Sequence, residues 1–420
     1  MKTRFLTFIL MLLFFGCKKS DTADTGDATI TLNNLQTLKD TATLTWSASG
    51  NAGFTSFSVV RRAGPINFSD TILRRRDPQF LQFRDTRVPY NSSVEYQVFG
   101  TLSSGTIVGS NIVKYERPEI KFVDVIPFDV RFDSTNRLLY FFEQTGGITI
   151  YSLQNSQVTK QINIASKFGY CDLGTYNGIK ELYVPGKDGQ LYIYNAQTLE
   201  LIDQLNIGFS LHCVVFNNDV LYVSSGSLQK PIQAYSRGTK NLISASVVQT
   251  AGLRFKKIPN SATELIGISE LYAPTAHHYY SFESNGNFLM YKHGIDPGYS
   301  LLDPGIFEVF PSGGKYISAF KGGIYNKDLL YLGRLPFYNS LPEYRGYYVD
   351  DVRQQIFCAT TSKTIEVYSV LDYSHIRTLT SDLYPYYIFK DGTNYISVNT
   401  RRVVSLDYAF AERVYIESFQ

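Results

Sequence analysis

The sequence predicts an all-β protein, and three observations lead to that prediction. Aromatic residues make up 15% of the 420 residues and charged residues only 18%, a balance that suits sheets better than long amphipathic helices. Beyond residue 17, no segment shows the apolar period of a long helix. From about residue 118 the chain instead repeats a fixed order of short apolar strands, which predicts several small sheets in succession.

Residues 1–16 have the composition of an export signal. Two basic residues precede an apolar run that ends at Phe15, and Gly16 then precedes Cys17. The run is too short to span a bilayer, which takes about 20 residues. A cysteine directly after Gly16 resembles the bacterial lipoprotein signal, in which the cysteine is acylated and becomes the mature N-terminus, although Phe14 stands where the family prefers leucine. A plain signal peptide with an incidental cysteine is the alternative.

Residues 17–27 are predicted to be a lipidated cysteine followed by a flexible tether. They are polar and lack any apolar period. Lysines, a serine and scattered acidic residues directly after the cysteine resemble the surface-export signal of Bacteroidota lipoproteins. The resemblance implies an outer-membrane protein that is held in the lipid bilayer through acylated Cys17, with the cell surface favoured over the periplasmic face.

Residues 28–117 alternate apolar and polar positions in short runs broken by turns, as a β-sandwich requires. The run 43–46 predicts a strand whose Leu44 and Trp46 face inward. Residues 85–98 resemble the region between the fifth and sixth strands of fibronectin type III domains, which carry a corner tyrosine where this chain has Val94. The resemblance implies a fibronectin type III-like β-sandwich over this range.

Residues 118–420 contain the repeat. Each copy contains an apolar strand such as 181–184, then a Gly-containing turn, a second strand with a tyrosine near its end and a polar outer strand. The copies recur about every 40–47 residues, which is the length of one β-propeller blade. Starts near residues 120, 167, 211, 253, 299, 344 and 384 predict seven blades, with six or eight as alternatives because the copy at 299–343 is irregular. Closure of the ring is assigned to residues 119–125 or to 413–419. Residues 192–202 resemble the repeats of YVTN and quinoprotein-like seven-bladed propellers.

Charge and cysteine content limit the partners. Removal of residues 1–16 takes away two basic residues and lowers the formal charge from +3 to +1, which gives no support for nucleic-acid binding. Apart from Cys17, the chain has Cys171, Cys213 and Cys358. An odd count in an exported protein argues against a disulfide framework and predicts buried free thiols. A bridge between Cys171 and Cys213 is the alternative.

No pattern of catalytic or metal-binding residues stands out. His277 and His278 are adjacent and would point to opposite faces of a strand, so they cannot chelate together. We therefore predict no metal and no cofactor. The predicted inner strands do carry titratable residues from which an acid/base pair for glycoside cleavage could be drawn, namely Asp129, Asp133, Asp172, His212, Asp350 and Asp351.

Aromatic residues at the predicted starts of inner strands form the candidate binding site, because these starts lie on one face around the axis of a propeller. They are Tyr170, Phe209, Tyr299, Tyr344, Tyr384 and Tyr386. The same face is predicted to receive His277, Lys363, Arg401 and Arg402. Such a ring suits stacking on a sugar or another flat, partly apolar ligand. Packing of these tyrosines between blades is the alternative.

These features predict a non-enzymatic outer-membrane lipoprotein whose propeller binds a ligand or a protein at the cell envelope. The expected partners are a glycan or vitamin, or an outer-membrane transporter or secretion complex; similar surface propellers of Bacteroidota capture cobalamin. The alternatives are a propeller enzyme (a glycosidase, lyase or quinone-dependent dehydrogenase) and a scaffold within an envelope assembly.

Overall fold

The computed structural model describes residues 28–50, 53–63, 69–246, 251–270, 275–295, 302–319, 321–336, 343–403 and 413–420. All regular elements in these ranges are β-strands, which confirms the all-β prediction. Within the same ranges no helix is long and apolar enough to cross a membrane. The predicted signal peptide, Cys17, the tether and Tyr299 lie outside the described residues. The chain divides into two compact units, one ending at Ile120 and the other beginning at Lys121.

The first unit consists of two antiparallel sheets that share one core. The first sheet contains β1 (Thr29–Leu32), β2 (Gln36–Leu38), β3 (Thr41–Ser49) and β6 (Gln82–Asp85). The second contains β4 (Phe54–Ala63), β5 (Ser69–Arg75), β7 (Ser93–Leu102), β8 (Ile107–Gly109) and β9 (Val113–Glu116). Leu44 and Trp46 are buried, as their alternation predicts. The Trp46 ring meets the Phe57 ring of the other sheet edge-on, with centroids 5.7 Å apart.

A buried tyrosine ties the two sheets of this unit together. Tyr96 on β7 donates its hydroxyl proton to Asp85 on β6 over 2.8 Å, and Arg61 on β4 donates to the same carboxylate over 2.9 Å. Burial and this carboxylate raise the pKa of Tyr96. The buried tyrosine therefore lies two residues after Val94, the position at which the fibronectin type III pattern expects one.

In the second unit, the described strands form seven antiparallel sheets of four strands each. The first three sheets are β11 (Pro127–Asp133), β12 (Leu138–Glu143), β13 (Gly147–Ser152) and β14 (Gln157–Asn163); β15 (Asp172–Tyr176), β16 (Ile179–Pro185), β17 (Gln190–Asn195) and β18 (Leu201–Asn206); and β19 (Leu211–Asn217), β20 (Val220–Ser225), β21 (Ile232–Ser236) and β22 (Leu242–Ala245). The next three are β23 (Leu253–Lys257), β24 (Glu264–Ser269), β25 (Ala276–Phe282) and β26 (Phe288–Ile295); β27 (Phe307–Val309), β28 (Lys315–Ser318), β29 (Gly323–Asn326) and β30 (Tyr331–Arg334); and β31 (Tyr344–Asp350), β32 (Gln355–Thr360), β33 (Thr364–Ser369) and β34 (His375–Thr380).

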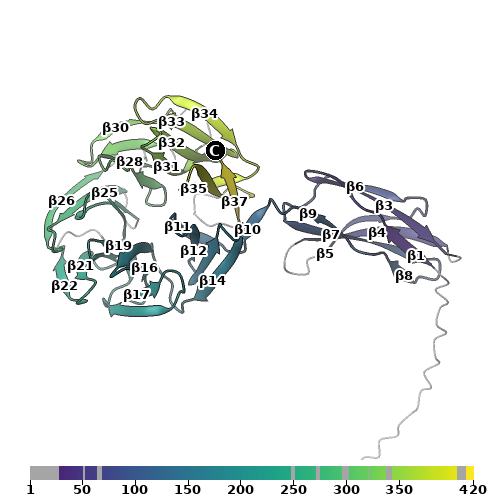
Figure 1. The fold of residues 1–420 in the computed structure, drawn as a ribbon, viewed down its shortest axis with the longest axis horizontal. Helices are drawn as coiled ribbons and strands as arrows, with labels where there is room; N and C mark the ends of the chain where they lie inside the picture. Colours follow the sequence, from purple (N-terminus) through teal and green to yellow (C-terminus); the bar gives the residue numbers. More distant parts are fainter. Residues whose placement is uncertain are drawn as a thin grey trace, which may run out of the picture. The chain divides into compact units, whose positions relative to one another are not determined.

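The last sheet joins the two ends of the unit. It runs in the order β10 (Lys121–Val123), β37 (Val414–Phe419), β36 (Asn394–Thr400) and β35 (Tyr384–Asp391). Both segments considered for closure take part, because Phe122 pairs with Tyr415 in the antiparallel β10–β37 ladder. In Figure 1 the sheets of this unit follow one another around a ring, with their first strands innermost. The arrangement is propeller-like.

Four of the seven predicted repeat starts agree with the structure. Predicted starts 211, 253, 344 and 384 coincide with the first residues of β19, β23, β31 and β35. The starts predicted at 120 and 167 come too early, because β11 begins at Pro127 and β15 at Asp172. The irregular copy predicted at 299 begins its first strand at Phe307, and its strands are only three or four residues long. Short strands leave few alternating positions, so the sequence pattern locates this sheet less well.

Aromatic rings fill the space between neighbouring sheets. Tyr183 on β16 and Phe216 on β19, for example, stack with centroids 4.9 Å apart and an interplanar angle of 17°. Cys171, Cys213 and Cys358 are all free and buried, as predicted, and the alternative bridge between Cys171 and Cys213 is absent from this structure. Burial raises the pKa of each of these thiols.

Candidate functional site

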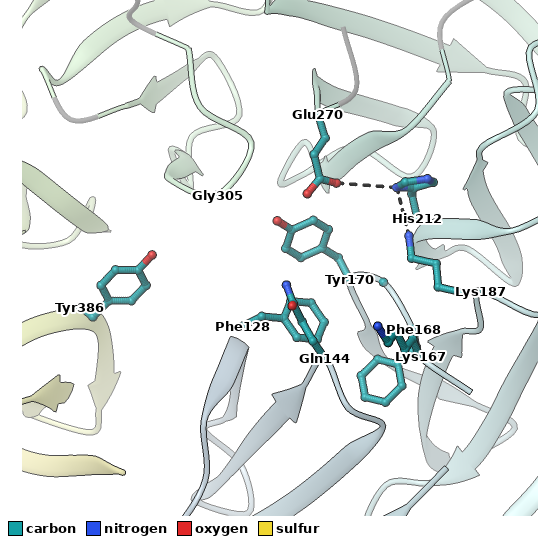
Figure 2. Close-up of a pocket in the computed structure, with 11 residues that line it drawn as sticks. Phe128, Gln144, Lys167, Phe168, Tyr170, Lys187, His212, Glu270, Gly305 and Tyr386 are labelled. Atoms are coloured by element: carbon teal, nitrogen blue, oxygen red, sulfur yellow. Dashed lines mark hydrogen bonds and ion pairs between the residues drawn. The ribbon is translucent and has the colours of Figure 1, made fainter. Parts of the chain in front are cut away.

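A pocket of about 300 Å³ opens where several inner strands begin, on the side of the ring that we call the amino face. Figure 2 shows its lining, which comes from six of the seven sheets or the segments that lead into and connect their strands. The lining residues are Phe128, Gln144, Lys167, Phe168, Gly169, Tyr170, Lys187, His212, Glu270, Gly305 and Tyr386. The pocket therefore combines aromatic rings with cations and one carboxylate.

Close backbone contact places Tyr170 in the pocket wall. The Tyr170 amide donates to the His212 carbonyl over 2.8 Å, and the Val214 amide donates to the Tyr170 carbonyl over 3.1 Å. A Cβ atom on Gly169 would lie 1.9 Å from the His212 carbonyl oxygen. Glycine at 169 therefore permits the segment before β15 to lie directly against β19.

Three polar side chains form one wall of the pocket. Lys187 Nζ lies 3.1 Å from His212 Nδ1, and Glu270 Oε2 lies 3.7 Å from the same nitrogen. A charged lysine only donates, so His212 Nδ1 accepts from Lys187 when the imidazole is neutral. When the imidazole carries a proton on Nδ1, that proton can face Glu270 instead. His212 therefore lies between a cation and a carboxylate.

The charges in this wall alter the acidity of its members. Burial lowers the pKa of Lys187 below its ordinary value, and the negative charge of Glu270 opposes only part of that effect. Burial raises the pKa of Glu270, but the His212 hydrogen bond and the charges of His212, Lys187 and Arg254 outweigh it, so the net pKa is lowered. Glu270 is the one carboxylate among the described residues that line the pocket.

A buried ion pair crosses the ring beneath the pocket. Arg254 on β23 donates through Nη2 to Asp129 on β11 over 2.8 Å, and both side chains are almost fully buried. Nη1 of Arg254 also donates to the Pro304 and Gly305 carbonyls over 2.8 and 2.9 Å. The guanidinium lies 4.1 Å from the centroid of the Tyr170 ring. We call this Asp129–Arg254 contact the axial pair.

Of the residues predicted for a binding site, Tyr170 and Tyr386 line this pocket. In Figure 2 the Tyr386 hydroxyl points toward the space between it and Tyr170. The ammonium of Lys363 lies 5.4 Å from the centroid of the Tyr384 ring, away from the pocket lining. Tyr299 lies outside the described residues.

The other predicted site residues do not line the pocket. Phe209 packs against the apolar cluster between the β15–β18 and β19–β22 sheets. Tyr344 is buried and its hydroxyl lies 2.7 Å from that of Tyr368, while buried His277 hydrogen-bonds the Tyr316 hydroxyl. Arg401 and Arg402 are exposed after β36. Tyr344 and Phe209 therefore pack between sheets, which was the alternative to a role in ligand binding.

Six lining residues that carry side-chain chemistry were not predicted from the sequence: Phe128, Gln144, Lys167, Phe168, Lys187 and Glu270. Lys187 and Gln144 lie in the turns between the second and third strands of their sheets, which the repeat pattern assigns to the same face as the inner-strand starts. That pattern was the available signal for them.

Of the inner-strand carboxylates, Asp133 pairs with Lys180 over 3.4 Å and Asp350 with Lys390 over 2.7 Å.

Within the described ranges, no group of three or more His, Cys, Asp or Glu side chains is placed to hold a metal ion. No protein-family model matches the sequence, and no curated protein matches it either.

Proposed function

We propose that this chain is a lipid-anchored envelope protein with a ligand-binding propeller. In this proposal an acylated Cys17, a tether, a fibronectin type III-like sandwich and a seven-bladed β-propeller follow one another along the chain. Gly16-Cys17 after the apolar run supports the anchor. The two sheets around Trp46 support the sandwich, and seven four-stranded sheets with joined ends support the propeller.

In this proposal the amino-face pocket binds a small acidic sugar. The observation that carries it is the composition of the lining. Phe128, Phe168, Tyr170 and Tyr386 offer rings on which a sugar face can stack. Lys167, Lys187 and His212 supply donors for a carboxylate, and the volume of about 300 Å³ is at the lower end of ordinary ligand sites.

Calorimetry with glucuronate and glucose tests this function on the full chain purified in detergent. Glucuronate should bind, and glucose should bind at least about tenfold more weakly because it lacks the charged partner for Lys187. Lys187→Met should weaken glucuronate binding by a similar factor. Lys160→Met is the matched control, since Lys160 is exposed on β14. Equal binding of both sugars, or an equal effect of both variants, would contradict the proposed site.

One observation favours a second candidate, a lyase that acts on acidic glycans. Such an enzyme removes a proton beside a carboxylate, and it needs a general base within reach of that proton. Lys187 has a lowered pKa and contacts His212. A two-carboxylate glycosidase is less well supported, because Glu270 has no second carboxylate among the described lining residues. Formation of an unsaturated uronide from polygalacturonate, abolished by Lys187→Met, would establish the lyase over the pure binder.

The proposed partner is an outer-membrane transporter or secretion complex that receives the ligand or the propeller. Pull-down from solubilised membranes tests for it. If a membrane protein is recovered in stoichiometric amount and the propeller binds neither glucuronate nor glucose, the scaffold alternative is favoured. Recovery together with glucuronate binding would favour ligand delivery.

A further inference from the structure

A second cavity, of about 330 Å³, lies further along the inner strands, beyond the axial pair. Its walls come from the first strands of the sheets, β11, β15, β19, β23, β27 and β31, and from β35. Arg254 of the axial pair lines this cavity, whereas Tyr170, which lies against the same guanidinium, lines the amino-face pocket. We call it the carboxyl-side cavity.

The charges lining this cavity do not balance. Among the described lining residues, four cations face three carboxylates. Lys257 pairs with Asp172 over 3.0 Å, and Lys256 pairs with Glu308. The remaining carboxylate, Asp129, is shared by two arginines.

Arg131 is the cation left incompletely compensated. Its Nε lies 3.2 Å from Asp129 Oδ2, yet both atoms are buried without a hydrogen bond because the geometry is unsuitable. The other carboxylate oxygen of Asp129 is taken by Arg254. Among the described residues, buried Nε of Arg131 has no hydrogen-bond partner, and the side chain is 23% exposed, with five N–H groups to donate. Such a group in a partly buried site calls for an acceptor from outside the chain.

Aromatic rings also line the cavity. Phe132 and Phe389 have centroids 5.7 Å apart, and the rings of Tyr387 and Phe389 are nearly parallel at an interplanar angle of 5°. All three are only partly buried and line the cavity. A flat apolar body can therefore pack here while a charged end reaches Arg131.

We propose that the carboxyl-side cavity is a second binding site, for a small aromatic carboxylate held by the Arg131 guanidinium. A planar guanidinium matches a carboxylate with two parallel hydrogen bonds. The axial pair separates this site from the amino-face pocket, so the two can be tested independently.

Calorimetry with benzoate and its uncharged analogue benzamide tests the site on the full chain in detergent. Benzoate should bind in the millimolar range expected of so small a ligand, and benzamide should bind at least about tenfold more weakly. Arg131→Met should weaken benzoate binding by about tenfold or more. Arg131→Lys, which keeps the charge, should restore part of the affinity and guards against a folding defect. Arg377→Met, at an exposed position on β34, should change nothing.

The amino-face variant Lys187→Met separates this site from the proposed glucuronate site. It should leave benzoate binding unchanged. Loss of benzoate binding in Lys187→Met with retention in Arg131→Met would overturn the second site and place the anion in the amino-face pocket. Equal binding of benzoate and benzamide, or no binding of either, would also overturn it, whatever glucuronate does.

Discussion

The axial pair is expected to contribute strongly to the stability of the second unit. Asp129→Asn preserves the shape of the side chain but removes its charge, which leaves Arg254 and Arg131 without their shared carboxylate. Asp129 is fully buried and Arg254 is only 3% exposed. Breaking a buried ion pair by removing one partner costs about 3–5 kcal/mol, because the other charge stays buried without compensation.

Urea unfolding measures this cost, and the chain provides its own control. At a denaturant dependence of about 3 kcal/mol per molar urea for a unit of this size, the midpoint should fall by about 1–1.7 M. Circular dichroism should follow the sheets of both units. Trp46 is the only tryptophan of the chain and lies in the core of the first unit, so its fluorescence should report that unit alone and should not shift.

A double-mutant cycle distinguishes the pair from its separate members. Arg254→Met also loses two hydrogen bonds to carbonyls, but it leaves Asp129 beside Arg131. The double variant Asp129→Asn, Arg254→Met should be less destabilised than the sum of the single variants by about 2 kcal/mol, as expected for residues in contact. A midpoint shift below about 0.3 M for Asp129→Asn, or strictly additive single effects, would refute the reasoning.

Three further predictions follow from the structure and the sequence. Burial lowers the pKa of His277 to about 4 and that of His278 to about 3, so the unfolded chain binds protons first as pH falls below about 6.5. The free energy of unfolding should therefore drop by about 2 kcal/mol per histidine between pH 7 and 5. The urea midpoint of His278→Gln should fall less steeply with pH than that of the wild type. Gly169→Ala should destabilise the second unit by about 1–3 kcal/mol and weaken glucuronate binding, because the alanine Cβ would clash with the His212 carbonyl. Gly314→Ala is the control: its Cβ would meet nothing within 4 Å, so its thermal melt should match that of the wild type. Cys17→Ser should move the protein from the membrane to the soluble fraction, and retention of this variant in membranes would contradict lipid anchoring.

Sequence reasoning located the sheets because their signal is local. Four-strand units with regular turns repeat along the chain, so the first residues of β23 and β31 could be predicted without knowing the ring. The sheet that begins at Phe307 was placed less well, because its strands are too short to show alternation. Closure was left open between two segments, since pairing of β10 with β37 joins residues nearly 300 positions apart.

The candidate site was predicted only in part because its contacts are not local. Tyr170 and Tyr386 were found from the aromatic residues at inner-strand starts. Tyr344, with the same local pattern, is instead packed against Tyr368. The contact between Asp129 and Arg254 spans 125 residues, and nothing in the sequence around either residue indicates its partner. Whether an aromatic residue at the start of an inner strand faces the pocket or a neighbouring sheet depends on how the ring is assembled.

Hydrogen–deuterium exchange with and without glucuronate tests the central claim most directly, because it locates the ligand on the chain. Binding in the amino-face pocket predicts slower exchange in peptides covering residues 166–172 and 185–190, where the Tyr170 and Lys187 walls are formed. Peptides of the first unit should exchange at unchanged rates. No change at saturating glucuronate, or protection confined to other parts of the chain, would contradict the claim that this pocket is the binding site.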